Sequence, residues 1–331
     1  MTEFSVLDLI PVREGGSLAE AFAASAALAQ SAESAGCKRF WVAEHHAMDG
    51  IAGGATSVVL AHIGNATDTI RIGAGGIMLP NHTPFQIAEQ FGTLDALFPG
   101  RVDLGLGRAP GAGPELQRAL RKNLAQASEY FPNDVVELRA LLTGDVELPL
   151  KATPGLGAKV QLWMLGSSLF GAQLAAQLGL PYAFAAHFAP DHLDEALQVY
   201  RRQFQPCETL EKPHVMVAMN VFAADTHEEA ELLASSQQQA FVALRSGTPG
   251  RLPPPVPNYT ETLPAPARAM LAHVGQAGAI GKPSEVRQTI EAFVARTGAD
   301  EILLCGSTYE PEARVRSLEM TLETMRAPVA A

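Results

Sequence analysis

The stretch Trp41-Val42-Ala43-Glu44-His45-His46 places a carboxylate and two imidazoles directly after a short apolar segment. Residues 38–43 are predicted to form a strand, and ionisable groups next to a buried strand are costly unless they have a use. A second stretch, Gly100-Arg101-Val102-Asp103-Leu104-Gly105-Leu106-Gly107-Arg108, repeats this design with a strand, glycines and then an arginine. Both stretches predict that functional side chains lie where strands end.

Strand-like and helix-like segments alternate along most of the chain. The predicted strands comprise residues 4–10, 38–43, 69–78, 102–106, 160–165, 182–185, 214–222 and 301–305. The predicted helices include residues 17–34, 55–65, 115–142 with a break near Pro132, 169–178, 191–204, 226–240, 283–296 and 310–325. A further helix carries an apolar stripe of Ile87, Phe91, Leu94 and Phe98. Eight such units predict a closed (β/α)8 TIM barrel more than an open doubly wound sheet.

We expect residues 1–331 to form a single barrel domain with one insertion after the seventh strand. Residues 244–281 contain Pro253-Pro254-Pro255 and several glycines, and they show no regular hydrophobic period. A connection of this length is usually an active-site lid or a disordered insertion. We therefore predict an irregular, lid-like segment over one end of the barrel.

Composition excludes several classes of partner. The formal net charge of −11 argues against nucleic acid, whose binding depends on neutralising phosphates with Lys and Arg. No apolar run reaches the length of a membrane span, and the start Met-Thr-Glu-Phe does not resemble a signal peptide. Three scattered cysteines, Cys37, Cys207 and Cys305, fit reduced thiols, so we expect a cytoplasmic protein.

In a (β/α)8 barrel the active site lies at the carboxyl ends of the strands. Polar residues and glycines gather at these predicted ends, which is the main argument from the residues for an enzyme. They are Asp8, Glu44, His45, His46, Gly75, Gly76, Gly107, Arg108, Gly166, Ser167, Ser168, His187 and Asn220.

The two adjacent histidines have three possible uses. One can be hydrogen-bonded in the core while the other is exposed. A metal site is a second use, but no His-x-His or His-Glu-x-x-His spacing supports one, so we expect no metal. In the third, His45 is a general base or hydrogen-bond donor, because an imidazole titrates near neutrality.

Arg108 and the segment Gly166-Ser167-Ser168 together predict an anion site. The serines precede a predicted helix whose free amides and dipole attract an anion, although a serine there is also an ordinary N-cap. Gly105, Gly107, Gly111 and Gly113 surround Arg108 without matching the dinucleotide or Walker fingerprints. Gly75-Gly76 suits either a planar ligand resting on backbone or a β-bulge.

Several motifs, in order, resemble those of the bacterial luciferase-like flavin-dependent monooxygenases, most closely their uncharacterised oxidoreductase branch. The similarity runs from Phe4 to about Asp225 and resumes near the C-terminus. The motifs are Ala43-Glu44-His45-His46, Arg71-Ile72-Gly73-Ala74-Gly75-Gly76-Ile77-Met78-Leu79-Pro80, Ala88-Glu89-Gln90, Gly100 to Arg108, and Trp163-Met164-Leu165-Gly166-Ser167-Ser168.

This resemblance implies a (β/α)8 barrel that uses reduced FMN, supplied by a separate flavin reductase, and dioxygen to oxidise a small or medium organic substrate. It implies that His45 is catalytic and that a non-proline cis peptide at Gly75-Gly76 lies under the flavin. Arg108 would bind the FMN phosphate together with Gly166, Ser167 and Ser168. The resemblance also implies a homodimer.

Further expectations concern the pocket. Asp8, Glu44 and His187 are candidates to contact substrate or flavin, and Phe184, Phe188 and Met219 suggest apolar walls. Gly107 stands where luciferase has a reactive Cys, so we expect neither light emission nor a long-chain aldehyde substrate. The alternatives are a deazaflavin-dependent oxidoreductase on the same fold, a non-catalytic partner subunit and a metal-dependent hydrolase.

Overall fold

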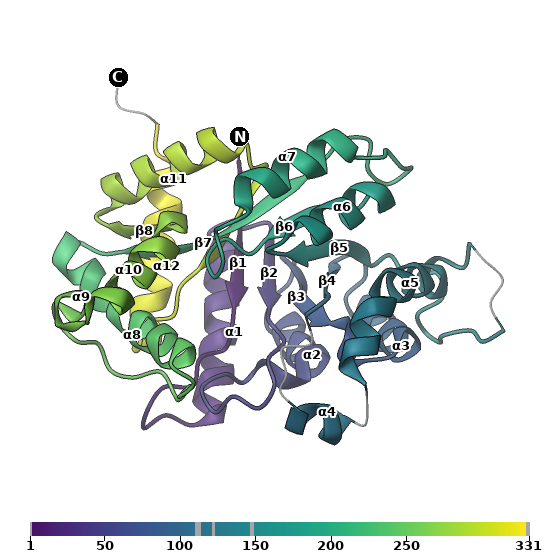
Figure 1. Ribbon diagram of the computed structural model, residues 1–331, viewed down its shortest axis with the longest axis horizontal. Coiled ribbons are helices and arrows are strands. Elements are labelled where there is room, and N and C mark those ends of the chain that lie inside the picture. Colours follow the sequence, from purple (N-terminus) through teal and green to yellow (C-terminus); the bar gives the residue numbers. More distant parts are fainter. Residues whose placement is uncertain (1, 110–113, 121–122, 146–148, 329–331) are drawn as a thin grey trace.

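The computed structural model describes residues 2–109, 114–120, 123–145 and 149–328. Eight parallel strands close into a barrel with helices around it (Figure 1). In sequence order the ring comprises β1 (Glu3–Asp8), β2 (Arg39–Val42), β3 (Arg71–Met78), β4 (Val102–Gly107), β5 (Gln161–Gly166), β6 (Tyr182–Phe184), β7 (Val215–Ala223) and β9 (Glu301–Cys305). Pairing of β6 with β7 and of β9 with both β7 and β1 closes the ring, so the predicted TIM barrel is confirmed.

Helices cover the outside of the ring. They are α1 (Leu18–Ser34), α2 (Thr56–Ala66), α3 (Pro84–Leu97), α4 (Pro114–Leu120), α5 (Leu124–Thr143), α6 (Leu169–Leu178), α7 (Leu193–Gln203), α8 (His227–Arg245), α9 (Tyr259–Thr262), α10 (Ala265–Val274), α11 (Pro283–Thr297) and α12 (Pro311–Arg326), with 3-10 turns at Gly53–Ala55, Leu79–Asn81 and Gly275–Ala277. Among the described helices, none is long and apolar enough to cross a bilayer.

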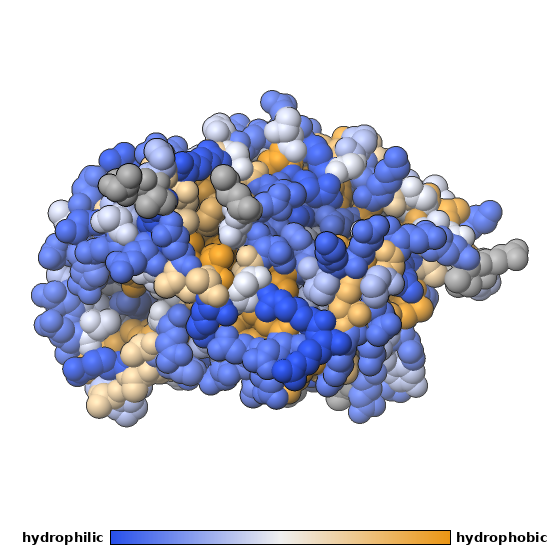
Figure 2. Space-filling model, turned by 90° about the horizontal axis from the view of Figure 1, so that it is seen from above, coloured by the Kyte–Doolittle hydropathy of each residue, from blue (hydrophilic) through white to orange (hydrophobic). Residues whose placement is uncertain are grey.

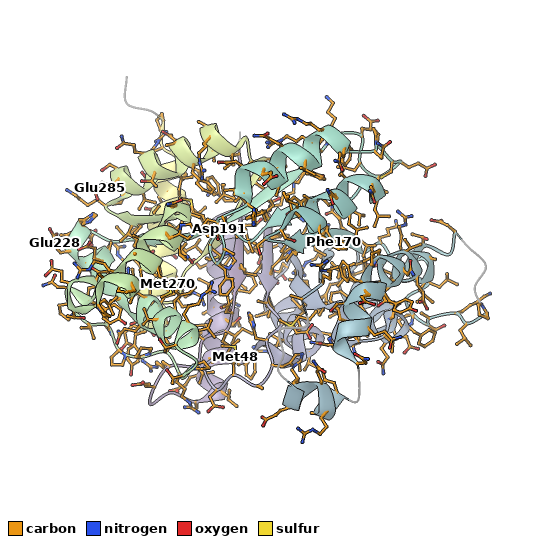
Figure 3. All side chains as sticks on the ribbon, in the orientation of Figure 1. Met48, Phe170, Asp191, Glu228, Met270 and Glu285 are labelled. Atoms are coloured by element: carbon orange, nitrogen blue, oxygen red, sulfur yellow. The ribbon has the colours of Figure 1, made fainter. Side chains whose placement is uncertain are left out.

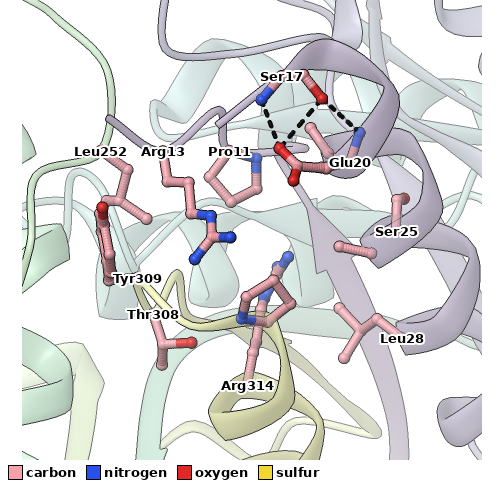
Figure 4. Close-up of a pocket in the computed structure, with 13 residues that line it drawn as sticks. Pro11, Arg13, Ser17, Glu20, Ser25, Leu28, Leu252, Thr308, Tyr309 and Arg314 are labelled. Atoms are coloured by element: carbon pink, nitrogen blue, oxygen red, sulfur yellow. Dashed lines mark hydrogen bonds between the residues drawn. The ribbon is translucent and has the colours of Figure 1, made fainter. Parts of the chain in front are cut away.

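Local sequence explains where α1 begins. The Ser17 hydroxyl accepts a hydrogen bond from the backbone N–H of Glu20, and the Glu20 carboxylate accepts one from the backbone N–H of Ser17 (Figure 4). This capping box satisfies two amides that the first helical turn leaves free. A small pocket of about 40 Å³ lies beside α1, and Figure 4 shows Arg13 and Tyr309 among the residues that line it.

The predicted helix break near Pro132 is wrong. Pro132 lies inside α5, and the helix instead begins after Asn123, which is its N-cap. A proline removes one helical hydrogen bond, but α5 is held against the barrel by Phe131, Val135 and Leu138, which are at most 1% exposed. Burial of this face therefore outweighs the local preference of the proline.

The insertion occurs where it is predicted, but it is not irregular. Residues 244–281 contain the end of α8, then α9, α10 and a ninth strand, β8 (Gly278–Gly281). This strand pairs with β7 alone, from Asn220 to Ala223, and lies outside the ring. The prolines that suggest an irregular segment occupy only the connection between α8 and α9.

The barrel interior is a small apolar cluster. It contains Leu7, Trp41, Ala43, Trp163, Ala183, Met216, Ala218, Leu303 and Cys305. The Trp41 and Trp163 rings meet edge to face, with centroids 5.2 Å apart. The stripe of Ile87, Phe91, Leu94 and Phe98 packs between α3 and the barrel and is at most 8% exposed, so it forms the wall.

A buried ion network closes the amino-terminal end of the barrel. Arg39 Nη1 lies 2.7 Å from Asp103 Oδ2, and Arg39 Nε lies 2.8 Å from Glu301 Oε1. Both carboxylates are fully buried. Burial raises the pKa of Glu301, but hydrogen bonds from His214 and the charge of Arg39 outweigh it and lower that pKa to about 2. Figure 2 views the molecule from this side, where hydrophilic residues cover most of the periphery and hydrophobic residues are visible near the middle.

Candidate active site at the barrel mouth

The carboxyl ends of the strands form the mouth of the barrel. They point toward the lower side of Figure 1, since Met48, which follows β2, is labelled there in Figure 3. Most of the predicted site residues lie at these ends. The two glycines of β3 are an exception, because the strand continues past them to Met78.

Glu44 connects three segments of the mouth. Its carboxylate is 2% exposed and its Oε1 lies 2.5 Å from His46 Nε2 and 2.8 Å from His82 Nε2. Its Oε2 accepts a hydrogen bond from the backbone N–H of Met78 at 2.9 Å. Burial raises the pKa of Glu44, but these hydrogen bonds and the charge of His82 lower it to about 2. The carboxylate is therefore ionised and holds the end of β3 against the end of β2.

His82 is absent from the sequence-based candidates because a lone histidine 38 residues away carries no spacing signal. The ligand atoms of Glu44, His46 and His82 lie within 4.8 Å of one another, which makes this group able to hold a divalent ion. A second such group, Glu3, His214 and Glu301, lies at the amino-terminal end. In the mouth the hydrogen bonds alone satisfy the Glu44 carboxylate.

The environment of the His45 side chain differs from that of His46. It is half-buried and makes no hydrogen bond to a described residue. Burial lowers its pKa below 6.5, while the charge of Glu44 opposes this effect. The pKa of His46 is instead raised, by its hydrogen bond to Glu44. His45 is thus a neutral imidazole near pH 7, with both nitrogens available to a bound molecule.

His187 lies close enough to His45 to sense its charge. Burial and that charge lower the pKa of His187 to about 4, and its buried Nδ1 has no hydrogen-bond partner among the described residues. The Asn220 side-chain amide donates to the His187 carbonyl at 2.8 Å. Gln237 Nε2 donates a hydrogen bond to Asn220 Oδ1 at 2.8 Å. Gln237 Oε1 accepts one from the backbone N–H of Ser307 at 2.7 Å. This chain of amides fixes the position of His187, and Gln237 is a second residue that sequence reasoning missed.

Asp8 forms hydrogen bonds through one of its two carboxylate oxygens. Its Oδ1 accepts hydrogen bonds from the backbone N–H of Ile10 at 2.8 Å and from Arg314 Nη1 at 2.7 Å. Its Oδ2 is buried without a partner among the described residues.

The prediction that Phe184, Phe188 and Met219 form apolar walls of the pocket is partly wrong. Phe184 and Met219 pack in the layer between the barrel and the helices, whereas Phe188 is 41% exposed.

Gly75 and Gly76 are joined by a non-proline cis peptide, as the resemblance implies. The pairing of β3 with β4 shifts register between Ala74 and Ile77, so the backbone is irregular here. A Cβ on Gly76 would lie 2.6 Å from the carbonyl oxygen of Gly105, which is closer than real Cβ atoms approach. Only glycine fits at this position.

Arg108 lies against the first turn of α6. The guanidinium lies over the ring of Phe170, 4.0 Å from its centroid, and Phe170 is in the first turn of α6 (Figure 3). Arg108 forms no ion pair with a described acidic residue. Gly111 and Gly113, also expected near Arg108, are outside the described residues.

The start of α6 has no side-chain cap. Ser168 occupies the N-cap position, but its side chain makes no capping hydrogen bond. A Cβ on Gly166 would meet nothing closer than 3.9 Å, so the backbone is accessible. A cation therefore lies beside an uncapped helix start that two serines precede, an arrangement that suits an anion.

The chain is similar to known proteins along most of its length. The family model of luciferase-like monooxygenases matches residues 2–301. A luciferase-like monooxygenase of Escherichia coli (strain K12) is 47% identical over 97% of this chain and 96% of its own. An N-acetyl-S-alkylcysteine monooxygenase of Bacillus subtilis (strain 168) is 36% identical over 75% of each chain. The crystal structure of apo-MsnO8 aligns with a TM-score of 0.87 at 32% identity, covering 98% of both chains.

More distant structures share the fold with different cofactors. The oxygenating constituent of 3,6-diketocamphane monooxygenase, in complex with FMN, aligns with a TM-score of 0.75 at 20% identity and 98% coverage of both chains. An F420-dependent secondary alcohol dehydrogenase aligns with a TM-score of 0.67 at 16% identity, covering 98% of this chain and 99% of its own. From the family match and the 47% identity, the chain belongs to the luciferase-like monooxygenase family, whose flavin-dependent members are oxidoreductases.

Proposed function

We propose that this protein is a monooxygenase that uses reduced FMN and dioxygen to oxidise a small or medium organic molecule. The observation that carries the proposal is the position of the Arg108 guanidinium over Phe170, at the open start of α6. A cation beside free helix amides and unbonded hydroxyls fits the phosphate of FMN. Arg108, Gly166, Ser167 and Ser168 would hold that phosphate.

The glycine pair supports the same assignment. Gly75 and Gly76 present backbone instead of side chains within β3, and neither position accepts a Cβ without displacing its neighbours. A planar ring system can therefore approach the strand closely. Glu44 keeps this part of β3 in place through its hydrogen bond to Met78.

When bound, reduced FMN supplies the two electrons with which dioxygen gives one oxygen atom to the substrate and one to water. The protein's part is to hold the reactants, keep out bulk water and move protons. His45, neutral and free of protein partners, is the residue that we assign to accept or donate a proton at its open ring nitrogen. His187 offers a second neutral imidazole beside it.

Further parts of the proposal concern assembly and supply. We propose a cytoplasmic, single-domain subunit that forms a homodimer and receives reduced FMN from a separate flavin reductase. The rival proposals are a deazaflavin-dependent oxidoreductase, which the fold of an F420-dependent relative supports, and a non-catalytic partner subunit. The His45 imidazole and the Arg108 guanidinium are both available to a ligand. This disfavours the proposal of a non-catalytic partner subunit, because such a subunit needs neither group.

An anaerobic titration with photoreduced FMN, followed by rapid mixing with air-saturated buffer, tests the proposal. We expect saturable binding of reduced FMN and reoxidation kinetics that differ from those of free reduced FMN. His45→Asn is expected to bind reduced FMN but to lose the altered kinetics. If reduced FMN does not bind, or reoxidises as it does in free solution, the monooxygenase proposal fails and deazaflavin becomes the next cofactor to titrate.

A further inference from the structure

A cavity of about 300 Å³ lies beside the barrel mouth, between the end of β7, β8, α8 and α10. In Figure 1 these helices form one group next to β8. The residues that matter for its chemistry are Asn220, Gln237, Gln238, Phe241, Leu271 and Val274. Its volume is at the lower end of the range for small-molecule pockets.

The cavity begins on the face of β7 that continues the barrel interior. Side chains alternate along a strand, and Met216 and Ala218 belong to the interior cluster. Asn220 and Phe222 follow on the same face of the strand: Asn220 is the last residue of β7 that pairs with β9, and Phe222 lies beyond this pairing. Asn220, which lines the cavity, also donates a hydrogen bond to the His187 carbonyl, so the cavity is one side chain away from the segment that carries His187.

The lining contains no ionisable side chain among the described residues. An ion placed here would lose its hydration without gaining a partner of opposite charge, which is costly. The nearby Arg245 is stacked on the rings of Phe188 and Phe241, 4.7 and 5.0 Å from their centroids. It also donates to the Phe188 carbonyl at 3.4 Å. The cavity thus favours an uncharged occupant.

One polar group of the lining is available. The side chains of Asn220 and Gln237 are hydrogen-bonded to each other, and the Thr289 hydroxyl donates a hydrogen bond to the Glu285 carbonyl. The Gln238 side chain makes no hydrogen bond to a described residue. An amide can donate and accept, so Gln238 can bind a carbonyl, an amide or a hydroxyl group.

We propose that this cavity binds the organic substrate, and that the substrate is a compact, uncharged molecule with an apolar body and one hydrogen-bonding group that Gln238 contacts. This inference rests on the proposed function for its reaction, but binding itself can be measured separately. Phe241, Leu271 and Val274 form the apolar wall, and Gln238 determines which polar group is accepted.

The test compares neutral and anionic probes of matched size. Benzamide with benzoate, and cyclohexanecarboxamide with cyclohexanecarboxylate, are titrated calorimetrically into the whole protein with and without oxidised FMN. We expect the amides to bind at least about tenfold more tightly than the carboxylates, since an unpaired buried charge is penalised. Equal or preferential binding of the carboxylates, or no binding of either amide, overturns the proposal.

Variants locate the site. Gln238→Leu is expected to weaken amide binding by about 2- to 10-fold, the range for one neutral hydrogen bond. Val274→Trp, which fills the cavity, is expected to abolish it. Gln239→Leu is the control, because the Gln239 side chain instead donates to the Pro254 carbonyl at 2.9 Å.

FMN affinity, measured in parallel, is expected to be unchanged in all three variants. Amide binding that all three variants leave intact would overturn the cavity assignment, whereas failure of FMN to bind the parent protein would overturn only the proposed function.

Discussion

At the scale of single residues, adjacent side chains in one motif acquire different chemistry. His46 is bonded to the buried Glu44 carboxylate and its pKa is raised, whereas the pKa of half-buried His45 is lowered. The sequence could predict that one of the two histidines is used, because both follow a strand. The resemblance singles out His45 as catalytic, but the cause of the difference between the two histidines was not predictable, since it depends on a carboxylate that also contacts distant His82.

His45→Asn should lower the rate of substrate oxidation by about 10²- to 10⁴-fold, the usual effect of losing a general acid or base. Because the pKa of His45 is below its ordinary 6.5, the neutral form dominates near pH 7 and is lost as the pH falls through that pKa. The rate of the parent protein should therefore decline below pH 6.5, and this decline should be absent from the residual rate of His45→Asn. His62→Asn, an exposed histidine on α2, is the control. An acid limb that persists in His45→Asn would contradict the assignment.

At the scale of elements, contiguous motifs are well predicted and long-range packing is not. Arg108 and the serines before α6 were expected together because both follow strands of one barrel. The chain of amides from His187 through Asn220 to Gln237 was not, because its members are widely separated in sequence. The regular structure in 244–281 was missed because the prolines of one connection conceal the flanking helices.

Gly76→Ala should destabilise the protein through β3. Its new Cβ would meet the Gly105 carbonyl oxygen at 2.6 Å and the Gly105 carbonyl carbon at 2.9 Å, and backbone on a neighbouring strand yields little. We expect the free energy of unfolding, measured with urea, to fall by about 1–3 kcal/mol. Gly107→Ala is the matched control, since its Cβ would meet only the Ile77 carbonyl oxygen at 3.6 Å and should change stability by less than about 0.5 kcal/mol. Equal stability of the two variants would refute this account of the packing.

At the scale of the whole molecule, the two ends of the barrel have different tasks. The amino-terminal end contains a saturated ion network around Arg39, and the carboxyl end contains groups without partners. This division is the one expected for a (β/α)8 barrel, in which catalysis is at the carboxyl ends of the strands. Alternation of strands and helices was enough to predict the barrel, but Arg39, Asp103 and Glu301 are far apart in sequence and their network was not predictable.

Arg39→Met tests the role of the network. It would leave the buried carboxylates of Asp103 and Glu301 without their cation, and loss of one partner from such a group costs about 3–5 kcal/mol. Arg296→Met, which breaks an exposed pair with Asp194, should cost only about 0–1 kcal/mol. Urea unfolding of both variants checks this difference, and a similar loss in the two would mean that the network does not stabilise the barrel.

The most direct test of the central claim is the affinity of the parent protein and of Arg108→Ala for FMN and for riboflavin, which lacks the phosphate. We predict that the parent protein prefers FMN. Arg108→Ala should weaken FMN binding by about 10- to 150-fold, the range for a hydrogen bond to a charged group, and leave riboflavin binding unchanged. An Arg108→Ala protein that keeps its preference for FMN over riboflavin would show that the phosphate lies elsewhere and would contradict the assigned site.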